Sequence, residues 1–221
     1  MIKIEFLGAL ACIGASGVLV DTGDEKILLD YGADVEEIPP RPPLSVTEKV
    51  DAIIATHAHL DHIGSIPILM KKNPVPIFGL PVTKELTELL LKDSLKLSME
   101  AVGNIEKASL PFEEKDIHTT VKNFATKNYR KPFKIRNSQI TFFNAGHIPG
   151  SALTLVENYK KKILYTGNYN TIDTRLLKRA DENLPKFDIL ITESTYSDRD
   201  HPDRKKTERE FMHAVRQTIA S

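Results

Sequence analysis

Four side chains that could bind metal ions fall within six residues, in the stretch 56–64: His57, His59, Asp61 and His62. Neutral imidazoles and carboxylates are preferred ligands of zinc and related ions. In an extended chain His57 and His59 share a face and could bind one ion. Asp61 and His62 follow where the chain should turn into a helix, so they could serve a second ion nearby. A histidine-rich surface turn is the alternative, but such a turn seldom follows a buried-strand pattern.

Two more candidate residues stand where other strands should end. His147 lies in the glycine-flanked loop 145–152, directly after a predicted strand, and this context favours metal ligation over a structural role. Asp30 closes a predicted strand at residues 26–30. It could cap a turn, or it could orient a metal-bound histidine through the second ring nitrogen, and both alternatives stay open.

The composition excludes several classes of protein. The 221 residues are 41% hydrophobic, with 30 Lys+Arg against 30 Asp+Glu, which predicts a folded domain with no overall attraction to polyanions. A single cysteine, Cys12, excludes an internal disulfide framework and is expected to be buried. The chain opens with a strand pattern instead of a signal peptide, and it has no apolar run of the ~18 residues that span a membrane. We therefore expect a soluble, cytoplasmic protein.

The elements that position these residues alternate between strands and helices. A β-meander is predicted over residues 2–30, followed by a proline-rich loop at 35–48 and an apolar strand at 50–55 that leads into the histidines. A short helix is expected at 64–72 and a strand at 77–79. Thr83 is the predicted N-cap of a long helix. The predicted buried face of this helix comprises Leu86, Leu89, Leu90, Ser94, Leu97 and Ala101.

The second half of the chain begins with a predicted helix start at residues 112–116 and a basic segment with interleaved aromatic residues, 115–136. That segment could contact phosphates and bases, but a solvated charged face is the favoured interpretation. Strands are predicted at 138–144, 152–157, 162–166 and 187–192. A charged helical stretch is expected before the last strand, and a helix at 204–219. His118, His201 and His213 have no partners at useful spacing and are predicted to be surface residues.

The H-x-H-x-D-H motif, the late His147 and the strand-end turn Gly167-Asn168 together resemble the metal signature of the metallo-β-lactamase superfamily, with Asn168 where an Asp is expected. The stretch 190–196, Leu-Ile-Thr-Glu-Ser-Thr-Tyr, looks like the acidic motif that opens the β-CASP insertion of a nuclease group. The loop 145–152 is similar to the cleavage-and-polyadenylation-factor branch, especially its archaeal members. The resemblance covers nearly the whole chain.

The resemblance implies an α/β fold, the four-layer αββα metallo-β-lactamase sandwich. It assigns residues 1–196 to the N-terminal portion of that domain and residues 197–221 to the start of a truncated β-CASP insertion. It also implies two Zn2+ ions per site, although the ligands would accept manganese or iron. The ligands assigned by the resemblance are His57, His59 and His147 for one ion, Asp61 and His62 for the second, and position 168 as the bridge.

The activity that the resemblance implies is hydrolysis of single-stranded RNA at its phosphodiester bonds by a hydroxide bound to two metal ions. Asp30 would orient a metal-bound histidine, and Glu193 would orient a histidine of the β-CASP domain with a proton-relay role. Endonucleolytic and 5′–3′ exonucleolytic cutting both stay open, as does a homodimer formed through regions outside this chain. The remaining motifs and the return of the sandwich are expected beyond Ser221.

One departure from the family pattern bears on the activity. Asn168 replaces a bridging carboxylate by a neutral amide, which predicts weaker metal binding and a large loss of turnover. The position was either altered to give an inactive form or belongs to a natural non-catalytic paralogue that binds RNA or a partner protein. The other ligands are intact, which favours the first explanation. A hydrolase of small-molecule esters is a further alternative.

Overall fold

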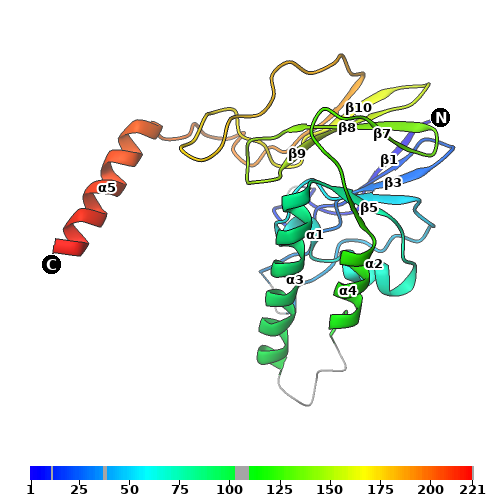
Figure 1. Ribbon diagram of the computed structural model, residues 1–221, viewed down its shortest axis with the longest axis horizontal. Helices are drawn as coiled ribbons and strands as arrows, with labels where there is room; N and C mark the ends of the chain where they lie inside the picture. The colour runs from blue at the N-terminus through cyan, green and yellow to red at the C-terminus, as the bar shows by residue number, and fades with distance from the viewer. Residues whose placement is uncertain (11, 37–38, 103–109, 221) are drawn as a thin grey trace.

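Two β-sheets stack face to face in the computed structural model, which describes residues 1–10, 12–36, 39–102 and 110–220 (Figure 1). The first sheet has the strand order β1-β2-β3-β4-β5-β6. Its first three strands form the predicted antiparallel meander, and β3 to β6 run parallel. The strands are β1 (Lys3–Phe6), β2 (Val18–Asp21), β3 (Lys26–Leu29), β4 (Ala52–Ile54), β5 (Ile77–Gly79) and β6 (Phe124–Thr126).

The second sheet has the order β11-β10-β9-β8-β7 and is antiparallel except for the parallel pair β10 and β11. Its strands are β7 (Phe133–Ile135), β8 (Ser138–Asn144), β9 (Ala152–Glu157), β10 (Lys162–Tyr165) and β11 (Ile189–Ile191). Every strand that the sequence predicts is present within two residues of its expected bounds. β6 and β7 are additional short strands that the sequence did not indicate.

Helices α2 to α4 cover the outer face of the first sheet, whereas α5 projects away from the body of the molecule (Figure 1). None of the residues of α5 is buried. An ion pair between Arg175 and Glu208, at 2.8 Å, links α5 to the loop before β11. The helices are α1 (Leu60–Ile63), α2 (Ile66–Lys72), α3 (Pro81–Val102), α4 (Glu114–Lys122) and α5 (Arg204–Ala220).

Three apolar clusters separate the layers. One lies between the helices and the first sheet, and a second lies between the two sheets. The alternation along β3 explains this arrangement, because Leu28 points to the helices while Ile27 and Leu29 point to the second sheet. The third cluster lies on the outer face of the second sheet, where, among the described residues, a loop through Ala180 and Leu184 covers it in place of a helix.

The buried face of α3 differs from the prediction. Leu89 and Leu97 are 62% and 53% exposed, whereas Leu91 is fully buried. The buried face also carries small polar residues. These are Thr83, Thr87, Ser94 and Ser98. Thr83 is not the N-cap, since α3 begins at Pro81; its hydroxyl donates to Gly150 O at 2.7 Å instead.

The helix predicted at 64–72 is present as α2, and a further helical turn, α1, precedes it at Leu60–Ile63. Two further expectations are wrong. The charged stretch before β11 is not helical, because its backbone bonds to the second sheet: Asp181 N donates to Asn144 O at 2.9 Å. Cys12 is exposed, in the loop that joins β1 to β2. The proline-rich loop is confirmed from residue 39 onward, while residues 37–38 and Ser221 lie outside the described part of the chain.

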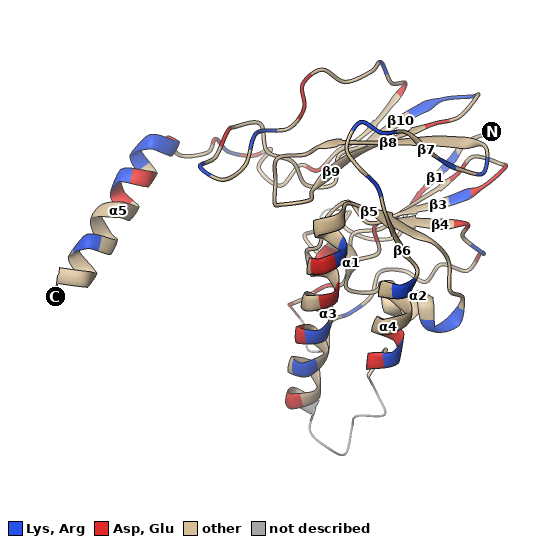
Figure 2. Cartoon of the chain, in the orientation of Figure 1, with Lys and Arg blue, Asp and Glu red and all other residues tan. Residues whose placement is uncertain are grey.

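The aromatic residues of the basic segment serve the fold. Phe133 packs against Phe78 and Phe142, and the Lys127 ammonium lies 5.0 Å from the centroid of the Phe133 ring. The Tyr129 hydroxyl donates to Ser151 O at 2.8 Å. Figure 2 shows basic and acidic residues interspersed along α3 and α4. These contacts agree with the interpretation of the segment as structural and solvated.

Candidate metal centre

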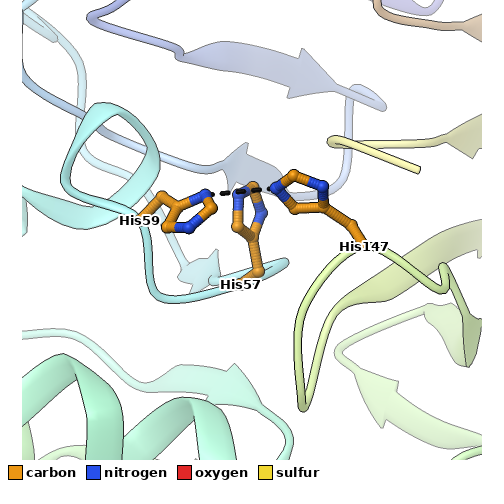
Figure 3. A group of neighbouring side chains, drawn as sticks. All are labelled: His57, His59 and His147. Atoms are coloured by element: carbon orange, nitrogen blue, oxygen red, sulfur yellow. Dashed lines mark hydrogen bonds between the residues drawn. The ribbon is translucent and has the colours of Figure 1, made fainter. Parts of the chain in front are cut away.

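Three histidine side chains from two loops converge at one end of the stacked sheets (Figure 3). His57 and His59 follow β4, and His147 follows β8. Their ligand nitrogens all lie within 4.8 Å of one another, and His59 Nδ1 is 3.1 Å from His147 Nε2. The structure therefore brings together the two histidines of the motif and the late histidine, as the sequence predicts.

The donor set at this cluster fits a metal ion. His57 is fully buried, and its Nε2 atom has no hydrogen-bond partner among the described residues. A buried polar atom without a partner is costly, and a metal ion is a natural partner for an imidazole nitrogen. Three imidazoles around one point also match the ligand set of a catalytic zinc site. The residues present could therefore hold an ion.

The surroundings of the three imidazoles favour their neutral form. Burial lowers the pKa of His57 well below its ordinary value, and the neighbouring imidazoles lower it further. Burial likewise lowers the pKa of His59 and of His147. Since only a neutral imidazole offers a lone pair to a metal ion, the electrostatics of the cluster favour the form that binds metal.

Asp30 lies beside this cluster as a fully buried carboxylate. Its Oδ2 atom is 2.7 Å from His62 Nδ1, and it accepts hydrogen bonds from the hydroxyls of Thr56 at 2.8 Å and Tyr165 at 3.0 Å. Its Oδ1 atom accepts from Thr56 N at 2.8 Å. Burial opposes a charge on His62, but the carboxylate of Asp30 outweighs it and raises the pKa of His62. This geometry is the one expected if Asp30 orients a histidine through its second ring nitrogen, which was one of the two alternatives for this residue.

A second group of polar residues lines a cavity of about 430 Å3 next to the cluster. His62 Nε2 is 3.5 Å from Asp61 Oδ2, and both residues line the cavity together with Asn168 and Glu193. Asn168 is half-buried and follows β10. The fold thus places four sequence-predicted residues in the lining of one cavity, although they come from three separate segments of the chain.

Glu193 follows β11 and is held by two contacts. Its Oε1 atom accepts from Tyr169 N at 3.0 Å, and its Oε2 atom accepts from the Thr195 hydroxyl at 2.6 Å. It therefore ties the segment after β11 to the turn that carries Asn168. By contrast, His118, His201 and His213 are exposed and lie outside the site, as predicted.

Backbone contacts fix the loops that carry the candidate ligands. Tyr31 N donates to His62 O at 2.9 Å, and Ser16 N donates to Asp61 O at 2.8 Å. The His147 loop is fixed by Ser151, whose buried hydroxyl accepts from His147 N at 3.1 Å. The sequence did not indicate the hydroxyl groups that contact the candidate site, namely those of Thr56 and Tyr165 at Asp30 and that of Ser151 in the His147 loop. The sequence signal for Thr56 and Tyr165 was only a polar residue at or just after the end of an apolar strand.

Comparison with known proteins identifies the superfamily of the chain. Residues 18–193 match the family model described as the metallo-beta-lactamase superfamily domain. The chain is 35% identical to "RNase aCSPSF2" of Saccharolobus solfataricus over 99% of its own length and 44% of that protein. It is 37% identical to "Probable RNase MJ4" of Methanocaldococcus jannaschii, over 98% of its length and 51% of that protein. The chain thus spans about half the length of these relatives.

A third relative, "Transcription termination factor FttA" of Methanocaldococcus jannaschii, is 34% identical over 98% of this chain and 35% of that protein. Among solved structures, a protein of unknown function from Enterococcus faecalis V583 has a TM-score of 0.54 at 18% identity, covering 77% of this chain and 44% of that chain. This likeness concerns the fold alone.

The chain belongs to the metallo-β-lactamase superfamily. The expected fold class and superfamily are therefore confirmed. Within the described residues, no helix has the length and apolar character needed to cross a membrane.

Proposed function

We propose that this chain forms the metal-binding half of a β-CASP ribonuclease that hydrolyses phosphodiester bonds of single-stranded RNA. The observation that carries the proposal is the convergence of His57, His59 and His147 on one point, with Nε2 of His57 buried and unpartnered among the described residues. The relatives named as RNases support the choice of RNA as substrate.

The proposed ligands divide into two groups. His57, His59 and His147 would hold one Zn2+ ion, and Asp61 with His62 would hold a second ion on the side of the cavity. When bound, the ions would supply Lewis-acid activation of water and of the phosphoryl group. The imidazole and carboxylate donors support zinc, although manganese and iron accept the same donors.

The protein groups around the ions would act by positioning. Asp30 holds the ring of His62 through Nδ1, so that Nε2 is the nitrogen directed to the cavity side. Glu193 joins the turn at residue 169 to the segment after β11. We assign it the role of orienting a histidine from a β-CASP segment, with residues 1–196 as the metallo-β-lactamase portion and residues 197–221 as the start of the β-CASP insertion.

Asn168 favours a second candidate function, binding of RNA or a partner protein without cleavage. Its amide offers one carbonyl oxygen and no negative charge, so it compensates two neighbouring cations poorly. It lines the same cavity as Asp61 and His62. The ribonuclease proposal therefore includes a turnover impaired at this position.

The experiment that separates the two functions compares the full-length protein with its Asn168→Asp variant, because the ribonuclease proposal assigns part of the catalytic site to a β-CASP segment. Zinc stoichiometry is measured by metal analysis after dialysis, and cleavage is followed on a labelled single-stranded RNA. The ribonuclease proposal expects more zinc bound and faster cleavage in Asn168→Asp, with His59→Asn in the same background as the inactive control. An Asn168→Asp variant that binds two zinc ions and leaves the RNA intact supports the non-catalytic function instead.

A further inference from the structure

The hydroxyl of Thr56 lies between Asp30 and His57, at 2.8 Å from Asp30 Oδ2 and 3.0 Å from His57 Nδ1. A hydroxyl has one hydrogen to donate. The carboxylate can only accept, so the hydroxyl hydrogen goes to Asp30. The oxygen of Thr56 must then accept a hydrogen bond from Nδ1–H of His57.

This arrangement determines the tautomer of His57. A neutral imidazole carries one proton, and with that proton on Nδ1 the lone pair is on Nε2. Nε2 is the buried atom of His57 that has no hydrogen-bond partner in the described part of the chain. The atom left free by the hydrogen bond to Thr56 is therefore the atom that the metal proposal requires.

The same carboxylate also acts on the other group of ligands. Asp30 Oδ2 lies 2.7 Å from His62 Nδ1, so this nitrogen carries a proton that it donates to the carboxylate, and Nε2 lies toward Asp61. Asp30 thus reaches one proposed ligand of each ion, directly at His62 and through a hydroxyl at His57.

Thr56 is also the point where the ligand-bearing segments meet. Its backbone N–H donates to Asp30 Oδ1 at 2.8 Å, and its carbonyl accepts from Ala152 N at 2.9 Å, at the end of the His147 loop. Gly167, next to Asn168, lies so close that a Cβ atom there would be 2.7 Å from the Thr56 hydroxyl. Three segments that are far from Thr56 in the sequence therefore contact this one threonine.

From these contacts the structure assigns Thr56 as a positioning residue that relays the carboxylate of Asp30 to His57 and so sets its tautomer, joining both groups of ligands in one hydrogen-bond network. The assignment of the tautomer stands on the metal-free geometry alone. Its consequence for metal binding rests on the proposed function.

The test uses the metal-free chain near neutral pH and reads the tautomer of His57 from the 15N chemical shifts of its ring. We expect the Nδ1–H form in the unsubstituted chain and in Thr56→Ser, which keeps the hydroxyl. Thr56→Val keeps the shape but removes the hydroxyl, and we expect His57 to move to the Nε2–H form that free imidazoles prefer. Tyr165→Phe is the matched control, because it removes a donor from Asp30 without contacting His57.

The second readout is zinc affinity, measured by competition with a chromophoric chelator. Loss of an outer partner of a ligating histidine typically weakens binding by about 10–100-fold, and we expect this range for Thr56→Val with near-complete recovery in Thr56→Ser. Circular dichroism checks that each variant is folded.

Three results overturn the assignment: the Nε2–H form of His57 in the unsubstituted chain, an unchanged tautomer in Thr56→Val, or a Thr56→Ser variant as weak as Thr56→Val. The first needs no substitution and holds even if Thr56→Val fails to fold. Failure of Asn168→Asp to cut RNA would overturn the ribonuclease proposal only, because the tautomer is read without substrate.

Discussion

A methyl group added at Gly32 tests how the fold positions the second group of ligands. Gly32 follows β3, and a Cβ atom there would lie 1.7 Å from Asp61 O, 2.0 Å from Asp61 C and 2.6 Å from His62 N. All three obstacles are backbone atoms of the segment that carries the candidate ligands. Gly32→Ala therefore cannot be accommodated by rotation of a side chain.

The size of the effect follows from the contacts that oppose the shift. Cβ atoms are essentially never found under 3.0 Å from a neighbour, so the gap of 1.7 Å must open by more than 1 Å. Two backbone hydrogen bonds hold the two segments together: Tyr31 N to His62 O and Ala33 N to Leu60 O. Overpacking of a rigid site typically costs about 1–3 kcal/mol, and the backbone obstacle places Gly32→Ala at about 3 kcal/mol of unfolding free energy.

The same shift should weaken metal binding, because a displacement of this size exceeds the tolerance of about 0.5 Å that a binding site allows. Urea unfolding followed by circular dichroism gives the free energy of unfolding, and chelator competition gives the zinc affinity. Gly17→Ala is the matched control: the change is identical, the position lines the same cavity as Asp61 and His62, and the nearest atom to a Cβ there is 3.5 Å away.

Equal stabilities of Gly32→Ala and Gly17→Ala would refute the reasoning. That result would mean that the segment at Asp61 moves freely relative to the end of β3. A large loss of stability in both variants would also count against it, since glycine flexibility and not close approach would then be the common cause.

Three further perturbations test other parts of the structure. Leu91→Ala should cost about 2–5 kcal/mol of unfolding free energy because Leu91 is fully buried, whereas Leu89→Ala should cost about 0.5 kcal/mol or less. Equal losses would contradict the assignment of Leu91, and not Leu89, to the buried face of α3. The pKa of His57 is lower in the folded chain than its ordinary 6.5, so protonation favours unfolding and the metal-free chain should lose stability as pH falls below 6.5. His57→Asn should reduce this loss. Identical pH profiles of the free energy of unfolding in the two proteins would contradict the lowered pKa. Glu208→Gln removes the exposed ion pair with Arg175 and should leave the melting temperature of the body unchanged, measured by calorimetry; a clear decrease would show that α5 stabilises the body.

The sequence by itself determined the strands and most of the candidate ligands. Apolar alternation and turn residues located β2, β3, β8 and β9, because period-two patterns are a local property of the chain. The spacing of His57, His59, Asp61 and His62 indicated a metal site for the same reason: four ligand types within six residues are visible without any contact being known. The proposed roles of Asn168 and Glu193 stay predictions.

Contacts between distant segments were decided by the tertiary structure alone. The leucine-rich face of α3 looked like the core by composition, but the buried face is the one that carries Thr83, Thr87 and Leu91. Likewise, Thr56 is one polar residue among many in the sequence. The parallel pairing of β3 and β4 places its hydroxyl against Asp30, 26 residues away in the sequence. The stacking of the two sheets brings Gly167, which follows β10, next to the same side chain.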